Sequence, residues 1–215
     1  MLSYRNKRLI RKFTRKRIII YGSVLAVLVV LSLFAPYFAP YDPIQISMEG
    51  RKSPNLDHIF GTDRLGRDIL SRIIYGTKYS LSIGIMSVSI GLIFGTTMGV
   101  LSAYYGGLVD TIIMRFIDAL LAFPGILLAL VVIAVLGPGL FNVMLAVGIS
   151  TVPEYARLAR GKVLSVMQLE YIEAIHSIGG SNIRVILKHI LPNISAPITI
   201  LATLQVGNAI LVGSG

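Results

Sequence analysis

Long apolar runs separated by polar segments dominate the chain. The runs cover residues 18–35, 80–103, 112–136, 140–152 and 194–215. A transmembrane helix needs about 20 mainly apolar residues, so all runs except the fourth are long enough to cross a bilayer. We expect the helix of the fourth run to continue past Pro153, with Arg157 and Arg160 reaching the membrane interface. The pattern therefore predicts an all-α, polytopic transmembrane helical bundle with five spans.

The first two runs are joined by a polar segment, residues 36–79, that carries charges of both signs. Pro36 and Pro40 lie where the first run ends, and proline disfavours continuation of a helix. Near the end of the segment, apolar side chains recur at helical spacing, namely Leu65, Ile69, Leu70, Ile73 and Ile74. We therefore expect an amphipathic helix at the membrane interface, capped by Asp63 or Thr62.

Basic residues are concentrated at the start of the chain. Eight of the 20 lysines and arginines lie within residues 1–17, directly before the first apolar run. Positive charge beside a span is typical of the cytoplasmic side and is attracted by anionic lipid. We therefore predict a cytoplasmic N-terminus at 1–17, a span at 18–35 and an external segment at 36–79. A cleaved signal peptide is the alternative, but the apolar run is longer than a usual signal core.

The composition supports a membrane protein. Hydrophobic residues make up 54% of the 215 positions and charged residues only 14%, with a mean hydropathy of +0.77. Because a soluble domain has about 25% charged residues, a single soluble domain is excluded. The net charge of +10 would suit nucleic acid, but its concentration before the first span indicates membrane lipid instead. We expect no nucleic acid partner.

Glycines recur at four-residue spacing in the second apolar run. Gly91, Gly95 and Gly99 fall on one face of a helix, with Gly84 a heptad before Gly91. A smooth face of this kind lets a second helix approach closely within lipid. The alternative is that these are ordinary membrane glycines, because glycine is common in transmembrane helices. Since three glycines share the register, we predict a helix-packing seam.

One carboxylate lies well inside an apolar run. Asp118 falls in the third run, and Arg115 precedes it by about one helical turn. A charge at the bilayer centre costs about 2.5–3.5 kcal/mol, so such a group is usually paired or functional. A role in a transport pathway or proton relay is one interpretation. We favour the other, in which Asp118 pairs with Arg115 near the cytoplasmic interface.

A polar interval at about 157–193 has the pattern of a helical hairpin between two spans. Apolar residues recur at helical spacing in its first half; Gly179 and Gly180 then interrupt the helix, and Ser181 is placed to cap another. We expect the second helix to stop at Pro192. The apolar faces of this hairpin need a partner, which is either the ends of its own spans or a separate soluble protein.

Residues suited to catalysis or metal binding are sparse. The chain has no cysteine, and His58, His176 and His189 share no ligand spacing. Gly161-Lys162 lacks the Ser or Thr that would complete a phosphate-binding loop. We therefore expect no cofactor, no bound metal and no ATP hydrolysis by this chain, which would not be an enzyme. Any energy must enter from a partner.

The hairpin resembles the EAA loop of bacterial ABC importer permeases. The likeness rests on Glu173, Ala174, Ile175, Gly179, Ile190, Leu191 and Pro192, with isoleucine at 175 where the name of the loop implies alanine. Further likeness to dipeptide, oligopeptide and nickel permeases lies at 61–68, Asp110, Arg115, Asp118, 122–124, 136–139, 155–157 and 189–193. Because the ordered set extends over most of the chain, the resemblance is specific.

The resemblance implies the fold of a type I ABC importer and a multi-pass permease subunit in a bacterial or archaeal inner membrane. Such a subunit forms half of the pathway for peptides or a related small solute such as nickel. The implied partners are a second, similar permease subunit, cytoplasmic ATP-binding subunits, an external or periplasmic solute-binding protein and membrane lipid. In that family the EAA loop docks on the ATPase as a short coupling helix.

Permeases of that family have six spans, whereas five are predicted here. The resemblance therefore implies a chain that ends before the last span. Two other classes of protein remain as alternatives: a secondary transporter, which needs more ionisable residues in its core, and a membrane scaffold without a transport role.

Overall fold

The computed structural model describes the backbone of residues 4–48 and 50–214, and the side chains of residues 19–48, 50–175 and 177–213. In this part of the chain the regular structure is helical, and the one β-bridge is an isolated pair, Thr62 with Asp68. The chain divides into two compact units, Met1–Leu81 and Ser82–Gly215. The predicted all-α fold is confirmed.

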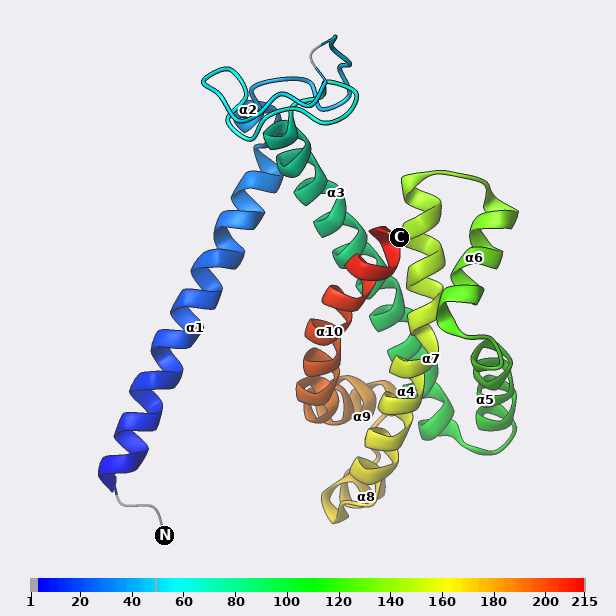
Figure 1. The fold of residues 1–215 in the computed structure, drawn as a ribbon. Coiled ribbons are helices and arrows are strands. Elements are labelled where there is room, and N and C mark those ends of the chain that lie inside the picture. Colours follow the sequence, from blue (N-terminus) through cyan, green and yellow to red (C-terminus); the bar gives the residue numbers. More distant parts are fainter. Residues whose placement is uncertain (1–3, 49, 215) are drawn as a thin grey trace. The chain divides into compact units, whose positions relative to one another are not determined.

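The first unit contains α1 (Tyr4–Leu33), the short α2 (Ala35–Phe38) and the start of α3 (Ile69–Ile90), as Figure 1 shows. The apolar part of α1 is Ile19–Leu33, and the side chains of the eight basic residues before it lie outside the described ones. As predicted, α1 ends before Pro36. That proline lies in the first turn of α2, where its missing N–H costs no helical hydrogen bond.

The segment between α2 and α3 is held by turns, and α3 begins later than the predicted amphipathic helix, at Ile69. Its cap is Asp68, not Asp63 or Thr62: the backbone N–H of Ser71 donates a 2.7 Å hydrogen bond to Oδ2 of Asp68. The prediction was wrong because the side chain of Asp63 is engaged in the turn before the helix, where it accepts two backbone hydrogen bonds.

The second unit is a bundle of helices (Figure 1). α3 continues through a π-helical turn, η1 (Gly91–Gly95), into α4 (Thr96–Tyr105), and together they form one helix of 37 residues. The other elements are α5 (Gly107–Leu121), α6 (Gly125–Leu136), α7 (Leu140–Met167), α8 (Glu170–Ser177), α9 (Asn182–Val185), a second π-helical turn η2 (Ile186–Ile190) and α10 (Leu191–Ser214).

The third apolar run, residues 112–136, is not one continuous helix. It divides into α5 and α6, which meet at an angle of 90°. Pro124 lies at the break with a backbone ψ of 135°, and it has no N–H group to continue the hydrogen bonds of α5. A proline also disfavours helical geometry in the residue before it. The single third span expected from the sequence is therefore replaced by a bent pair.

Two helices of the described chain are long and apolar enough to cross a bilayer, Ile69–Tyr105 and Asn182–Gly213. The α5–α6 pair is a third if its two halves make one span. The apolar part of α1, Ile19–Leu33, belongs to the shorter class of apolar helices. The number of five spans stays a prediction.

α7 is the central element of the second unit. As predicted, it continues through Pro153, which is buried. Ala156 and Ala159 are fully buried along it, and Tyr155 beside them has 0% of its surface exposed. Because α4, α6 and α10 all pack on α7, a displacement of α7 must reach each of these neighbours.

Candidate functional site

The α8–α9 turn, residues 170–190, contains most of the residues predicted to contact a partner. Between its helices the backbone of Gly179 has a φ of 82°, which glycine adopts without strain. The N–H of Gly180 donates a 2.9 Å hydrogen bond to the carbonyl of Ile175, which closes the end of α8. The helix therefore breaks at the predicted glycines.

One face of the α8–α9 turn is anchored in the bundle. Ile172 of α8 is 2% exposed and Val185 of α9 is 0% exposed, and both belong to the core cluster that includes Val163 of α7. The side-chain amide of Asn193 donates a 3.0 Å hydrogen bond to the hydroxyl of Tyr171. The turn is thus tied to the end of α7 and to the beginning of α10.

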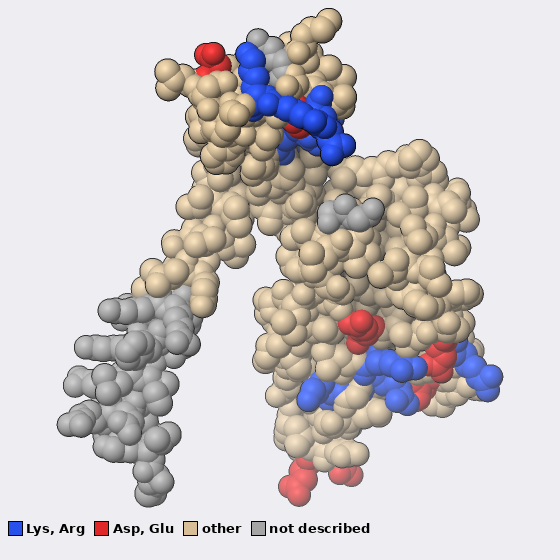
Figure 2. Space-filling model, in the orientation of Figure 1, with Lys and Arg blue, Asp and Glu red and all other residues tan. Residues whose placement is uncertain are grey.

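The opposite face of the turn is open. Glu173 and Ala174 are exposed, and three apolar side chains protrude with most of their surface uncovered, Ile178 (84%), Ile183 (71%) and Leu187 (57%). Figure 2 shows acidic side chains alone at the α8 end of this unit, and the acidic residues of α8 are Glu170 and Glu173. Exposed apolar side chains beside charged ones are typical of a protein-binding surface.

The remaining residues of the predicted coupling loop differ in burial. Gly179 and Pro192 are exposed, Ile175 and Leu191 are half-buried, and Ile190 is fully buried. The loop therefore has an outer part around α8 and an inner part at the start of α10, where Ile190 belongs to the core of the bundle.

Two details of the predicted hairpin were wrong. Ser181 precedes α9, but its side chain makes no capping hydrogen bond to the described residues. Pro192 does not end the second helix, because α10 runs through it to Ser214. The π-helical turn η2 lies directly before Pro192, and its different hydrogen-bond spacing lets the helix pass a residue that has no N–H.

α7 lies against the three glycines of the predicted seam, Gly91, Gly95 and Gly99. A Cβ atom on Gly95 would lie 2.5 Å from the carbonyl oxygen of Val152 and 2.6 Å from the Cβ of Tyr155. On Gly99 it would lie 2.8 Å from the Cβ of Ala159. Since real Cβ atoms essentially never come within 3.0 Å of such neighbours, a side chain at these positions would push the two helices apart.

An aspartate near the start of α5 pairs with an arginine of α7. Arg160 donates from Nε to Oδ1 of Asp110 at 2.7 Å and from Nη2 to Oδ2 at 2.6 Å. The hydroxyl of Ser102, in α4, donates to the same carboxylate. The two charged side chains are 35% and 25% exposed. A two-pronged pair of this kind holds three helices in one geometry.

Asp118 also pairs with α7, which corrects the predicted partner. Nη2 of Arg157 donates a 2.8 Å hydrogen bond to its Oδ1, with both side chains 58% exposed, so the charge is balanced by Arg157 rather than by Arg115. The physical reason is the packing of α5: Ile117 is buried against Ala156, and this contact brings the neighbouring Asp118 within reach of the residue after Ala156.

The two ion pairs line one groove of about 450 Å³ between α5 and α7. Figure 2 shows the charged side chains of the second unit gathered in a band over these elements, next to a broad uncharged surface. Because each carboxylate is matched by a guanidinium, the groove joins the bent α5–α6 pair to α7 without a large net charge.

A polar network between α7 and α10 was not predicted. Nε2 of Gln205 donates to Oε2 of Glu154, and Nδ2 of Asn208 donates to Oε1 of Gln205 at 3.2 Å. The sequence contains one signal of it, since Gln205 and Asn208 are three residues apart in an apolar run and so share a helix face. The link to Glu154 depends on which helices touch, which no local pattern shows.

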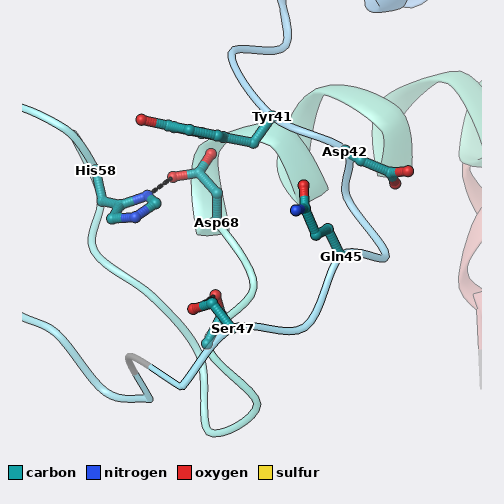
Figure 3. Close-up of a pocket in the computed structure, with 7 residues that line it drawn as sticks. Tyr41, Asp42, Gln45, Ser47, His58 and Asp68 are labelled. Carbon is teal, nitrogen blue, oxygen red and sulfur yellow. Dashed lines mark hydrogen bonds and ion pairs between the residues drawn. The ribbon is translucent and has the colours of Figure 1, made fainter.

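A small polar pocket lies in the first unit (Figure 3). It has a volume of about 170 Å³ and is lined by Tyr41, Asp42, Gln45, Ser47, His58, Gly66 and Asp68. Nδ1 of His58 lies 3.0 Å from Oδ1 of Asp68, and the ring of Tyr41 lies over the pair, 4.8 Å from the ring of His58. Burial raises the pKa of Asp68, but hydrogen bonds from Ser71 and His58 outweigh it and leave this pKa below its usual value.

Two family profiles match the chain. Residues 91–212 match the family described as the binding-protein-dependent transport system inner membrane component. Residues 6–56 match the N-terminal transmembrane domain of oligopeptide transport permease C. The first match contains the glycine seam, both ion pairs between α5 and α7, and the α8–α9 turn.

Individual proteins are similar over nearly the whole chain. The glutathione transport system permease protein of Pectobacterium atrosepticum is 41% identical over 207 residues, which cover 95% of this chain and 69% of that protein. The dipeptide transport system permease protein of Alkalihalophilus pseudofirmus is 41% identical over 203 residues, 94% of this chain and 67% of that protein. This chain therefore spans about two thirds of the length of both relatives.

One solved structure bears on the fold alone. The crystal structure of an amino acid ABC transporter with histidines has a TM-score of 0.50 and 16% identity, and the likeness covers 67% of this chain and 75% of that one. The helical arrangement around α7 is thus found in a membrane transporter of remote sequence.

Proposed function

Because the chain belongs to the family of binding-protein-dependent inner-membrane transport components, the permease subunits of ABC importers, we propose that it carries peptides. Support comes from relatives named for dipeptide and glutathione transport, since glutathione is itself a short peptide. The proposed cargo is a dipeptide or oligopeptide. Nickel, the other solute implied by the sequence resemblance, finds no support in these names.

The proposed partners follow from the architecture of such importers. The chain would form half of the pathway beside a second, similar permease subunit, while cytoplasmic ATP-binding subunits hydrolyse ATP and an external solute-binding protein delivers the peptide. The observation that carries this proposal is the two-sided α8–α9 turn. Its inner face is anchored through Ile172, whereas Ile178 and Ile183 protrude beside Glu173. This is the form expected of a segment that docks on another protein.

The connections of the turn suggest how docking could move the pathway. Ile172 packs in the same core as Val163 of α7 and Ile194 of α10. A push on the exposed face of the turn, generated when the ATP-binding subunits close, would therefore reach both helices. α7 would pass it to α4 through the glycine seam and to α5 through the two ion pairs. Rigid tilting of packed helices in this way produces alternating access.

The proposed orientation keeps the basic N-terminus, residues 1–17, in the cytoplasm, with a first span at 18–35. Residues 36–79 would then face the outside, where the solute-binding protein docks, and the loop at about 157–193 would face the cytoplasm. The permease part proper would extend over residues 80–215.

Loss of a protruding side chain tests the docking surface. We expect Ile178→Ser to reduce recovery of the ATP-binding subunits with the affinity-tagged permease by about tenfold, because a central apolar anchor contributes about 2 kcal/mol or more to an interface. The matched control is Leu56→Ser, which removes an equally exposed apolar side chain (101%) from the first unit and should not change recovery. Equal recovery with both variants would contradict the proposal.

Transport in proteoliposomes tests the cargo and the energy source. The complex with its ATP-binding and solute-binding subunits should take up a radiolabelled dipeptide only when ATP is present. Uptake of the dipeptide without ATP would instead support a secondary transporter. Uptake of radioactive nickel but no dipeptide would overturn the peptide proposal while leaving the ATP-driven mechanism in place.

A further inference from the structure

The network of Glu154, Gln205 and Asn208 lies deep in the apolar part of the second unit. Gln205 belongs to Asn182–Gly213, a helix long and apolar enough to cross a bilayer. It stands 14 residues after Leu191, about 21 Å along α10 at 1.5 Å per residue. Glu154 stands 13 residues before the end of α7, about 20 Å by the same measure. Both distances start at the α8–α9 turn, which places the network inside a hydrocarbon core of about 30 Å.

An exposed carboxylate at this depth requires polar surroundings. Glu154 is exposed in the chain, and Gln205 donates to one of its two oxygens. An ionised side chain that faces lipid is costly, so such residues border water-filled cavities or other polar groups. Only 17% of the most apolar stretch of the α10 span is buried within this chain. The side of the bundle that carries Glu154 is therefore suited to line a pathway.

The partners of Glu154 differ from those of the aspartates on α5. Asp110 and Asp118 each pair with an arginine, whereas the described partner of Glu154 is a neutral amide, which leaves its negative charge unbalanced. An alkylammonium group has a positive charge and three N–H donors, and thus complements a carboxylate flanked by amide oxygens. Asn208 supplies an amide oxygen one helical turn from Gln205 and is itself exposed.

We propose that Glu154, with the amides of Gln205 and Asn208, binds the α-ammonium group of a peptide as it passes through the permease. The site deepens the proposed function and rests on it. The hydrogen bond from Gln205 orients the carboxylate, and the bond from Asn208 orients the Gln205 amide in turn. Since Glu154 lies on α7, which also anchors the α8–α9 turn, occupancy of the site and the position of the turn are mechanically linked.

The absence of cysteine from the sequence permits a direct test in the assembled transporter. Leu204 is 69% exposed and lies one helical turn before Asn208, so Leu204→Cys places a single thiol beside the site without altering its side chains. A small, water-soluble, positively charged thiol reagent should modify this cysteine. Millimolar glycylleucine should slow the modification, and N-acetylglycylleucine, which has no ammonium group, should not.

Removal of the charge gives the decisive comparison. Adding Glu154→Gln to Leu204→Cys should weaken protection by glycylleucine about tenfold, because one charge-assisted hydrogen bond accounts for at least a factor of ten. Adding Glu154→Asp, which keeps the charge, should leave most of it. A further control is Asp57→Asn, the same loss of charge in the first unit, which should leave protection unchanged. Circular dichroism and recovery of the ATP-binding subunits verify that each variant is folded and assembled.

Three results would overturn the proposal: a cysteine at 204 that the reagent does not reach, equal protection by the acetylated peptide, or protection that survives Glu154→Gln. The first would mean that a partner subunit or lipid covers this face. ATP-driven dipeptide uptake by the unmodified transporter is measured in parallel. Uptake without charge-dependent protection removes the site alone, and charge-dependent protection without uptake removes the proposed function alone.

Discussion

Glycine is required both in the α4–α7 seam and in the α8–α9 turn, for opposite physical reasons. Gly95 in the seam has ordinary helical dihedral angles, with a φ of −65°, and it is the nearness of Val152 and Tyr155 that forbids a side chain. Gly179 in the turn has a φ of 82°, and no described atom lies within 4 Å of the place a Cβ would take. The first glycine serves a contact, and the second serves a backbone conformation.

This difference matches two mechanical tasks. A seam in which backbones touch has little freedom to deform, so it transmits displacement between α4 and α7. The turn is held on one side and open on the other, so its outer residues are available to a second protein. Substitutions in the seam should therefore act mainly on stability, whereas substitutions on the outside of the turn should act on assembly.

The largest loss of stability is expected in the seam. Gly95→Ala should destabilise the chain by about 1–3 kcal/mol, because its Cβ meets a backbone carbonyl that cannot move aside. Gly161→Ala on α7 is the matched control: no described atom lies within 4 Å there, so the better helix propensity of alanine should leave stability equal or higher. Thermal unfolding in detergent, followed by circular dichroism at about 222 nm, measures both. Equal melting temperatures would refute the seam.

The two-pronged ion pair comes next. Asp110→Asn should cost about 1–2 kcal/mol, a figure reduced from that of a buried pair because both side chains are partly exposed. Arg160→Lys should lose part of the same energy, since an ammonium group cannot donate in the fork geometry. A double-mutant cycle with Arg160→Gln isolates the pair. A coupling energy near zero would show that α5 is held to α7 by packing alone.

A smaller effect is expected at the turn. Gly179→Ala should destabilise by about 1 kcal/mol through backbone strain, and Gly179→Asn by less, because asparagine tolerates a positive φ. Recovery of the ATP-binding subunits should fall in the same order, since strain displaces the protruding Ile178. If alanine at 179 melts like the parent while alanine at 95 does too, the distinction between contact and conformation fails.

The smallest effect is expected at Asp118. With both side chains of the pair 58% exposed, Asp118→Asn should cost less than about 1 kcal/mol, and added salt should reduce the difference further. Comparing this variant with Asp110→Asn separates the two pairs that line one groove. A larger loss for Asp118→Asn than for Asp110→Asn would reverse the order inferred from exposure.

Features that depend on a few neighbouring residues were predictable. The all-α fold, the passage of α7 through Pro153 and the break at Gly179 follow from hydrophobic periodicity and from glycine and proline chemistry. Errors arose where a local rule had a competitor. Pro124 breaks a helix while Pro192 does not, because η2 absorbs the missing hydrogen bond only at the second position.

The amino-acid order alone specified the membrane character, the helices and the family resemblance, because each rests on composition or on contacts within a turn or two of one helix. The partners of the charged and polar groups came from packing. Arg157 reaches Asp118 across 39 residues, and Gln205 reaches Glu154 across 51. No periodic pattern encodes such pairs, since they form only after the side-chain shapes of α5, α7 and α10 have selected which faces meet.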